Sequence, residues 1–159
     1  GPYNATYNSR MAPRAVATPA GATGGCLFVV VSGHGEDARA NCAEFCPTSH
    51  HFSVNGAQER VADFSLAGTQ WGCAQQVAAG AVPNEYGTWF FGRNGWCNGR
   101  DVTPQSWDVS DELLPPGGTN VLRYRSLLRG EEYDGVSDVD GAAELLMSSY
   151  LVFYASGAA

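Results

Sequence analysis

Short runs rich in Val, Phe, Tyr and Leu recur along the chain, and each run is bounded by Gly, Pro, Asn or Asp. Runs of this kind favour β-strands, because branched and aromatic side chains pack well on a pleated surface. No long window places apolar residues at helical spacing, and only residues 140–147 are compatible with a single helical turn. We therefore predict an all-β fold, a β-sandwich with strands at residues 26–33, 51–56, 60–66, 120–128 and 148–156.

The N-terminal stretch differs in composition from the rest of the chain. Residues 1–25 are small, polar and rich in Pro and Gly. This composition predicts an extended arm or an edge strand rather than a part of the core. The 159 residues are enough for one domain with a single core. We therefore predict one sandwich domain over residues 26–159.

Charge limits the partners that the chain is expected to bind. The sequence contains 9 basic residues, all Arg, and 16 acidic residues, for a net charge of -7. Because the basic residues do not cluster, the chain lacks the positive surface that nucleic acids and anionic membranes require. The longest apolar runs, 27–31 and 150–155, are far shorter than the roughly 20 residues that cross a bilayer. We expect no nucleic-acid partner and no membrane span.

Cysteine content and one short motif indicate an extracellular, secreted protein. A chain of this length with 5 cysteines favours an oxidising compartment. Residues 4–6, Asn-Ala-Thr, form an N-glycosylation sequon in a polar, Pro-containing stretch that we expect to be exposed. Asn4 is therefore a candidate glycosylation site.

Residues 41–52, NCAEFCPTSHHF, concentrate groups that bind metals or form disulfides. Cys42, Cys46 and His50 recur at every fourth residue, which on a helix would align three zinc ligands. Pro47 argues against that helix, because a proline in a helix interior removes a hydrogen bond and clashes with the preceding turn. The C-x3-C spacing also differs from the C-x-x-C of thioredoxin-like redox motifs. We therefore expect no metal and no cofactor, and favour a small disulfide ring that pushes its acidic residue outward.

Several short motifs follow one another in an order and spacing that resembles a known family. They are SGHG at 32–35, NCAEFC at 41–46, WGC at 71–73 and WFFGRNGWC at 89–97. Together they resemble the C-terminal domain of peptide-N-glycosidase F-type amidases over most of the chain. The resemblance implies that the fold is the second of two jelly-roll β-sandwiches. It also implies that Cys42 pairs with Cys46 and Cys73 with Cys97, which leaves Cys26 as a free thiol that we expect to be buried.

The same resemblance implies an activity and a set of site residues. Amidases of this type hydrolyse the amide that joins the innermost N-acetylglucosamine of an N-linked glycan to asparagine. By motif, Glu44 matches the glutamate that this domain contributes to the active site, Arg93 a substrate-contacting arginine, and Trp96 part of the sugar-binding wall. His34 replaces a tryptophan and has a ring able to hydrogen-bond a sugar hydroxyl. Because the family's principal catalytic acid lies in the first sandwich, this chain alone is expected to be catalytically silent, with an N-linked glycan or glycoprotein as its partner.

Two other functions stay open. One is a non-catalytic structural or assembly module of an extracellular glycoprotein or filament, which would self-associate through the N-terminal arm or Cys26. The other is a copper monooxygenase of related two-jelly-roll architecture, which is disfavoured because His50 and His51 are adjacent rather than in an H-x-H pair. Individual residues also have plainer interpretations: aromatic residues such as Trp96 usually fill the core of a sandwich, and Glu44 can be an ordinary loop acid.

Overall fold

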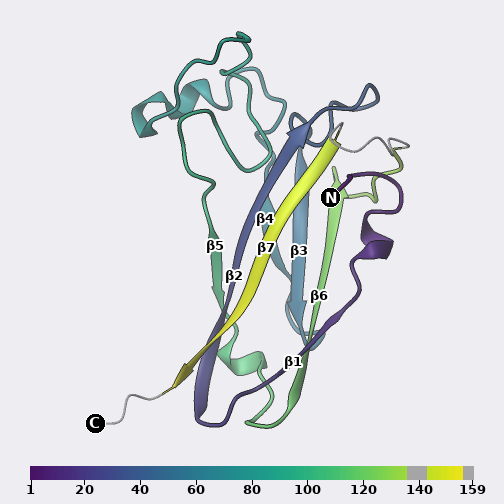
Figure 1. The fold of residues 1–159 in the computed structure, drawn as a ribbon, viewed down its shortest axis with the longest axis vertical. Coiled ribbons are helices and arrows are strands. Elements are labelled where there is room, and N and C mark those ends of the chain that lie inside the picture. Colours follow the sequence, from purple (N-terminus) through teal and green to yellow (C-terminus); the bar gives the residue numbers. More distant parts are fainter. Residues whose placement is uncertain (136–142, 156–159) are drawn as a thin grey trace.

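The computed structural model describes residues 1–135 and 143–155. Those residues contain the strands β1 (Arg14–Ala17), β2 (Ala22–Gly35), β3 (Thr48–Val54), β4 (Arg60–Asp63), β5 (Gln105–Asp108), β6 (Thr119–Leu128) and β7 (Ala143–Ala155). They also contain the short 3-10 helices η1 (Asn8–Arg10), η2 (Ala74–Ala79) and η3 (Ser110–Glu112). The strands form a 4-stranded sheet in the order β1-β6-β3-β4 and a 3-stranded sheet in the order β5-β2-β7. All pairs are antiparallel, and the two sheets lie as two layers (Figure 1), which confirms the predicted β-sandwich.

The core lies between the two sheets and follows the alternation of side chains along each strand. Leu27, Val29 and Val31 of β2 are buried and pack with Phe52 and Val54 of β3. Successive side chains in a strand point to opposite faces of its sheet. The apolar run at the centre of β2 is therefore buried completely on its inner face and only partly on its outer face.

β7 corrects one element of the sequence-based prediction. Residues 143–147, which were compatible with a helical turn, belong to this strand, where Ala143 pairs with Gly35 and Met147 with Val31. Because β2 offers backbone hydrogen-bond partners along the whole of β7, sheet pairing overrides the weak local preference for helix. The start of that window, residues 140–142, lies outside the described residues.

The N-terminal stretch packs more closely than its composition predicts. β1 lies at an edge of the four-stranded sheet, but Tyr3 and Tyr7 are buried in the core. The Tyr3 ring stacks on Tyr133 with centroids 4.8 Å apart, and the Tyr7 and Tyr124 hydroxyls lie 3.1 Å apart. The expectation that this stretch stays out of the core is therefore wrong at Tyr3 and Tyr7. Their partners, Tyr133 and Tyr124, are distant in sequence and come close only in the folded chain. The division of the chain into an arm and a domain stays a prediction.

Asn4 is buried, contrary to the expectation from sequence. Its residue is 3% exposed, and its Oδ1 accepts hydrogen bonds from the Thr6 backbone N–H at 3.0 Å and the Thr6 hydroxyl at 2.9 Å. The neighbouring tyrosines draw this segment into the molecule. The expected exposure is therefore wrong, whereas glycosylation of Asn4 stays a prediction.

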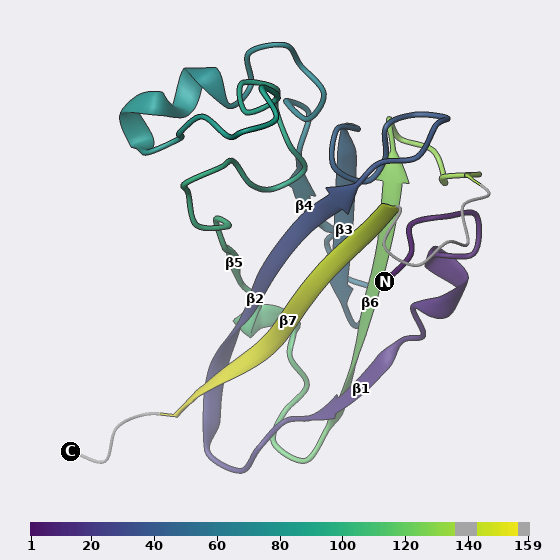
Figure 2. The same cartoon turned by 45° about the horizontal axis from the view of Figure 1, so that its top comes forward.

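Two long connections meet at one end of the sandwich, beyond the end of β2 (Figure 2). The first, residues 36–47, joins β2 to β3, and the second, residues 64–104, joins β4 to β5 and contains η2. A hydrogen bond of 2.8 Å from the Asn94 backbone N–H to the Glu44 carbonyl links the two connections. This end of the molecule therefore holds the predicted site residues. Among the described helices, none is long and apolar enough to cross a membrane.

Candidate functional site

The Cys42–Cys46 disulfide closes a small ring in the connection after β2, with Cα atoms 4.9 Å apart. Glu44 lies in the middle of this ring. Its backbone N–H donates to the Gly35 carbonyl at 2.9 Å, and its carbonyl accepts from Asn94. The ring is thus held on both sides, which fixes the direction in which the Glu44 side chain leaves the backbone.

The cysteines pair as the resemblance implies. Cys42 is bonded to Cys46 and Cys73 to Cys97, while Cys26 is a buried free thiol. Since Cys42 and Cys46 are bonded to each other, neither offers a thiolate to zinc. Within the described parts of the chain, no group of three or more His, Cys, Asp or Glu side chains is placed to hold a metal ion.

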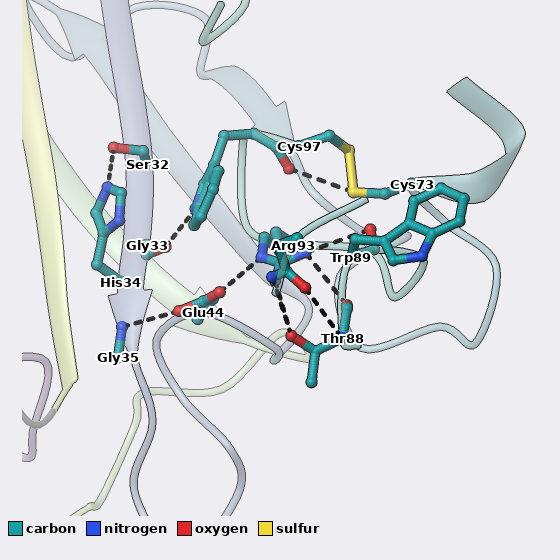
Figure 3. Close-up of polar contacts among 12 residues, drawn as sticks. Ser32, Gly33, His34, Gly35, Glu44, Cys73, Thr88, Trp89, Arg93 and Cys97 are labelled. Carbon is teal, nitrogen blue, oxygen red and sulfur yellow. Dashed lines mark hydrogen bonds and ion pairs between the residues drawn. A yellow bond between two sulfur atoms is a disulfide. The ribbon is translucent and has the colours of Figure 1, made fainter. Parts of the chain in front are cut away.

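Glu44 forms an ion pair with Arg93 that is largely shielded from solvent (Figure 3). Arg93 Nε donates to Glu44 Oε1 at 2.6 Å, and the Gly35 backbone N–H donates to Oε2 at 3.2 Å. The Arg93 side chain is 2% exposed and the Glu44 side chain 17% exposed. Each carboxylate oxygen therefore has one protein donor and retains a lone pair for another.

The remaining donors of Arg93 bind the loop that precedes it. Nη1 lies 3.3 Å from the Thr88 carbonyl and 3.4 Å from the Trp89 carbonyl, and Nη2 lies 3.2 Å from the Thr88 hydroxyl. A buried guanidinium without these partners would be costly, so the interactions hold the side chain in one orientation. Arg93 therefore ties the Thr88 loop to the carboxylate of Glu44.

Trp96 is held through its indole N–H, which donates to the Gly33 carbonyl at 2.7 Å. The His34 ring stacks on the indole with centroids 5.2 Å apart, and the Arg93 guanidinium lies 4.9 Å from the indole centroid. Figure 3 shows the His34 and Arg93 side chains well apart. The same guanidinium lies 5.0 Å from the Phe45 ring. The structure thus gathers these predicted site residues, and both the His34 ring and the Arg93 guanidinium pack against the partly exposed Trp96 ring.

Asn94 and Gly33 support the ring, and sequence reasoning did not single them out. Asn94 is completely buried, and its Nδ2 donates to the Ala43 carbonyl at 3.0 Å. A Cβ on Gly33 would lie 2.1 Å from the same carbonyl oxygen, so only glycine lets β2 run this close to the ring. The sequence signal that could have identified them is their position inside the SGHG and GRNGW motifs.

Buried side chains form a directed hydrogen-bond chain from Asn94 into the core. The Thr48 hydroxyl donates to Asn94 Oδ1 at 2.8 Å, so its oxygen accepts from His50 Nε2–H at 2.8 Å. Because burial keeps the imidazole neutral and its Nε2 carries the proton, Nδ1 is an acceptor, and the Tyr124 hydroxyl donates to it at 2.8 Å. Burial away from water is the main reason why the pKa of His50 is lowered from 6.5 to about 3.

We expect His50 to make the folded chain less stable in mild acid. The unfolded chain takes up a proton on His50 near pH 6.5, whereas the folded chain does so only near pH 3. The contribution of neutral His50 to the free energy of unfolding is therefore fully present above pH 6.5 and is lost progressively as the pH falls toward 3. Urea denaturation should show the free energy of unfolding dropping by about 2 kcal/mol between pH 7 and pH 5.

Two histidine variants separate this effect from general acid sensitivity. His50→Gln should flatten the pH dependence whatever it does to overall stability. His51→Gln, a change at the neighbouring histidine that pairs with Glu59 on the surface, should retain the dependence. Parallel pH curves for the wild type and His50→Gln would contradict the role of His50.

A groove of about 720 Å³ opens beside Glu44. Its lining combines Glu44, Arg93 and Trp96 with the loop at residues 83–88. In that loop Tyr86 is 78% exposed. Sequence reasoning missed Tyr86, because PNEYG at 83–87 has the composition of an ordinary exposed turn and matches no chemical motif.

Comparison with known families and structures agrees with the fold. The model of the family described as "Peptide-N-glycosidase F, C terminal" matches residues 2–152. No match was found among curated protein sequences. A crystal structure of a peptide-N(4)-(N-acetyl-β-D-glucosaminyl) asparagine amidase has a TM-score of 0.65 and 22% identity, over 89% of this chain and 43% of that one.

PNGase F of Flavobacterium meningosepticum, described as a glycosylasparaginase, has a TM-score of 0.67 and 19% identity, over 98% of this chain and 50% of its own length. PNGF-II has a TM-score of 0.58 and 15% identity, over 89% of this chain and 24% of that one. The chain therefore spans half or less of each of these structures. At such identities the likeness establishes the fold, and it confirms the predicted jelly-roll class.

Proposed function

The chain belongs to the family of peptide-N-glycosidase F C-terminal domains, and we propose that it is the glycan-contacting half of a secreted glycoamidase. In this role Glu44 contributes one acid to hydrolysis of the amide between N-acetylglucosamine and asparagine. A first sandwich would supply the second acid. The two disulfides support a site of action outside the cell, because such bonds persist in oxidising compartments.

The observation that carries the proposal is the Glu44–Arg93 pair beside an open groove. Each Glu44 oxygen accepts one hydrogen bond from the protein, so a ligand N–H, a sugar hydroxyl or a water can donate to the remaining lone pairs. Amide hydrolysis needs one group to orient the attacking water and another to protonate the leaving nitrogen. Since Glu44 is held as an acceptor by Arg93, it suits the orienting role. The chain alone should therefore bind the glycan core without cleaving it.

The test uses chitobiose, the disaccharide at the core of N-linked glycans, and calorimetric titration of the chain. We expect binding by the wild type, and affinity at least about tenfold weaker in Glu44→Gln because a charge-assisted hydrogen bond is lost. Glu59→Gln, which removes a half-exposed carboxylate paired with His51, should bind like the wild type. In parallel, the chain alone should release no glycan from a denatured glycoprotein. Absence of binding by a folded wild-type chain would reject the proposal.

The assembly-module function stays as a second candidate because of the exposed edge of β7. Among the described residues, Gly1 and Tyr3 bond only to the start of β7, at Ala143 and Leu145, while the strand continues to Ala155. Apart from Ser148, the exposed outward side chains on the rest of the strand are apolar or aromatic: Leu146, Tyr150, Val152 and Tyr154. Unprotected edges of this kind pair with other strands.

A second copy of the chain, paired along β7, is the form of assembly that this edge supports. The structure does not favour self-association through the N-terminal arm or through Cys26, the two modes expected from sequence. Tyr3 and Tyr7 of the arm are buried, and Cys26 is buried with its Sγ 2.9 Å from the Ser106 hydroxyl. Light scattering on the sample used for the titration distinguishes the two functions. A monomer that binds chitobiose supports the glycoamidase role, whereas a dimer that does not bind it supports assembly.

A further inference from the structure

Resting on the proposed function, we infer that Tyr86 is the platform on which a neutral N-acetylhexosamine ring stacks in the groove beside Glu44. Sugars commonly bind with their apolar C–H face against an aromatic ring and their polar groups against hydrogen-bonding side chains. The groove supplies both kinds of surface, and the position of its open aromatic ring follows from three features of the lining.

The first feature is that the other aromatic rings of the groove already pack against charged or aromatic groups of the protein. The Trp96 ring is only partly exposed and packs against both the His34 ring and the Arg93 guanidinium. Phe45 lies under the Arg93 guanidinium and meets Phe91 edge to face. Tyr86, by contrast, is largely exposed and stacks on no other ring among the described residues. Among the aromatic residues that line the groove, Tyr86 is therefore the most exposed, and among the described residues no ring or cation packs on it.

The second feature is that the Tyr86 loop is rigidly held despite its exposure. The Asn84 side chain spans the turn, with Nδ2 3.3 Å from the Thr88 hydroxyl and Oδ1 accepting from the Thr88 backbone N–H at 3.2 Å. Thr88 is in turn bound by Arg93, which pairs with Glu44. Because a fixed platform loses little entropy on binding, this arrangement suits recognition of a ring at a set position relative to Glu44.

The third feature is the polarity of the groove. Glu36 and Glu85 line it together with Glu44, and the positive charge of Arg93 is already paired with Glu44. Asn98 also lines the groove, and its Oδ1 is buried without a hydrogen-bond partner. An unpaired acceptor is costly, and a small turn of this amide would let a ligand hydroxyl or acetamido N–H satisfy it. Donor-rich neutral sugars therefore fit the groove, whereas anionic sugars such as sialic acid would be repelled.

The experiment measures chitobiose binding by the full chain, with Tyr86→Ala and Tyr86→Phe as the variants. We expect Tyr86→Ala to weaken binding at least tenfold and Tyr86→Phe to stay within about threefold of the wild type, because stacking needs the ring rather than its hydroxyl. Tyr150→Ala, at an exposed tyrosine on the outer face of β7, is the matched control and should bind normally. Saturation-transfer NMR should show magnetisation passing to the sugar in the wild type but strongly reduced in Tyr86→Ala. N-acetylneuraminic acid should give no measurable binding.

The outcomes separate this inference from the function on which it rests. If the wild type binds chitobiose and Glu44→Gln weakens binding while Tyr86→Ala does not, the platform is wrong and the glycan-binding role stands. If Tyr86→Phe loses binding as fully as Tyr86→Ala, hydrogen bonding by the hydroxyl replaces stacking and the inference is overturned. If the folded wild type binds no chitobiose, the proposed function and the Tyr86 platform fall together.

Discussion

Arg93→Met is expected to lower the free energy of unfolding by about 3–5 kcal/mol, because it leaves the Glu44 carboxylate in a shielded position without its cation. The substitution also removes the donors to the Thr88 and Trp89 carbonyls and the group that packs between Trp96 and Phe45. Urea denaturation at neutral pH measures the loss. Methionine keeps much of the side-chain volume, so the cost reports mainly on charge and hydrogen bonding.

A double-mutant cycle assigns this cost to the pair. Glu44→Gln should destabilise the Arg93→Met background less than the wild type, because its partner charge is already gone. Arg125→Met is the surface control: the Arg125 side chain is 52% exposed and pairs with Glu59, so its loss should cost less than about 1 kcal/mol. If Arg93→Met costs no more than Arg125→Met, the pair does not organise the site.

Replacing Cys73 and Cys97 together by alanine should cost about 3.5 kcal/mol, because the bridge closes a loop with a sequence separation of 24. That loop carries Thr88, Arg93 and Trp96. Without the bridge the unfolded chain gains entropy, and the native loop loses the bond that joins its two ends. Non-reducing urea denaturation gives the stability, and titration with chitobiose should show weaker binding as well.

The shorter bridge is the matched comparison. Cys42→Ala with Cys46→Ala opens a loop with a sequence separation of only 4, for which the expected cost is about 2 kcal/mol. Its effect on binding should nevertheless be strong, because Glu44 lies inside this ring. A larger loss of stability from opening the shorter ring than from opening the longer one would contradict the loop-entropy argument.

The resemblance to the amidase family, which its motifs carry, indicated which side chains to examine. These were Glu44 between two cysteines, and Arg93 and Trp96 shortly before Cys97, and they meet at one end of the sandwich. The spacing did not indicate that His34 and Arg93 would pack on Trp96, because His34 belongs to β2 whereas Arg93 and Trp96 belong to the connection between β4 and β5. Nor did it mark Tyr86 or Asn94, whose roles depend on what surrounds them. Exposure and burial are properties of the folded environment and not of the residue type.

The sequence by itself determined the strand-rich character of the chain, its excess of acidic over basic residues and the short cysteine ring, because alternation, charge and spacing are local properties. Tertiary structure decided the rest. The Glu44–Arg93 bond joins residues 49 positions apart, and the burial of Tyr3 against Tyr133 joins opposite ends of the chain. It also decided that β7 is one continuous strand, since the pairing energy comes from β2. Such contacts depend on how two sheets and two long connections pack together, and no local pattern records that packing.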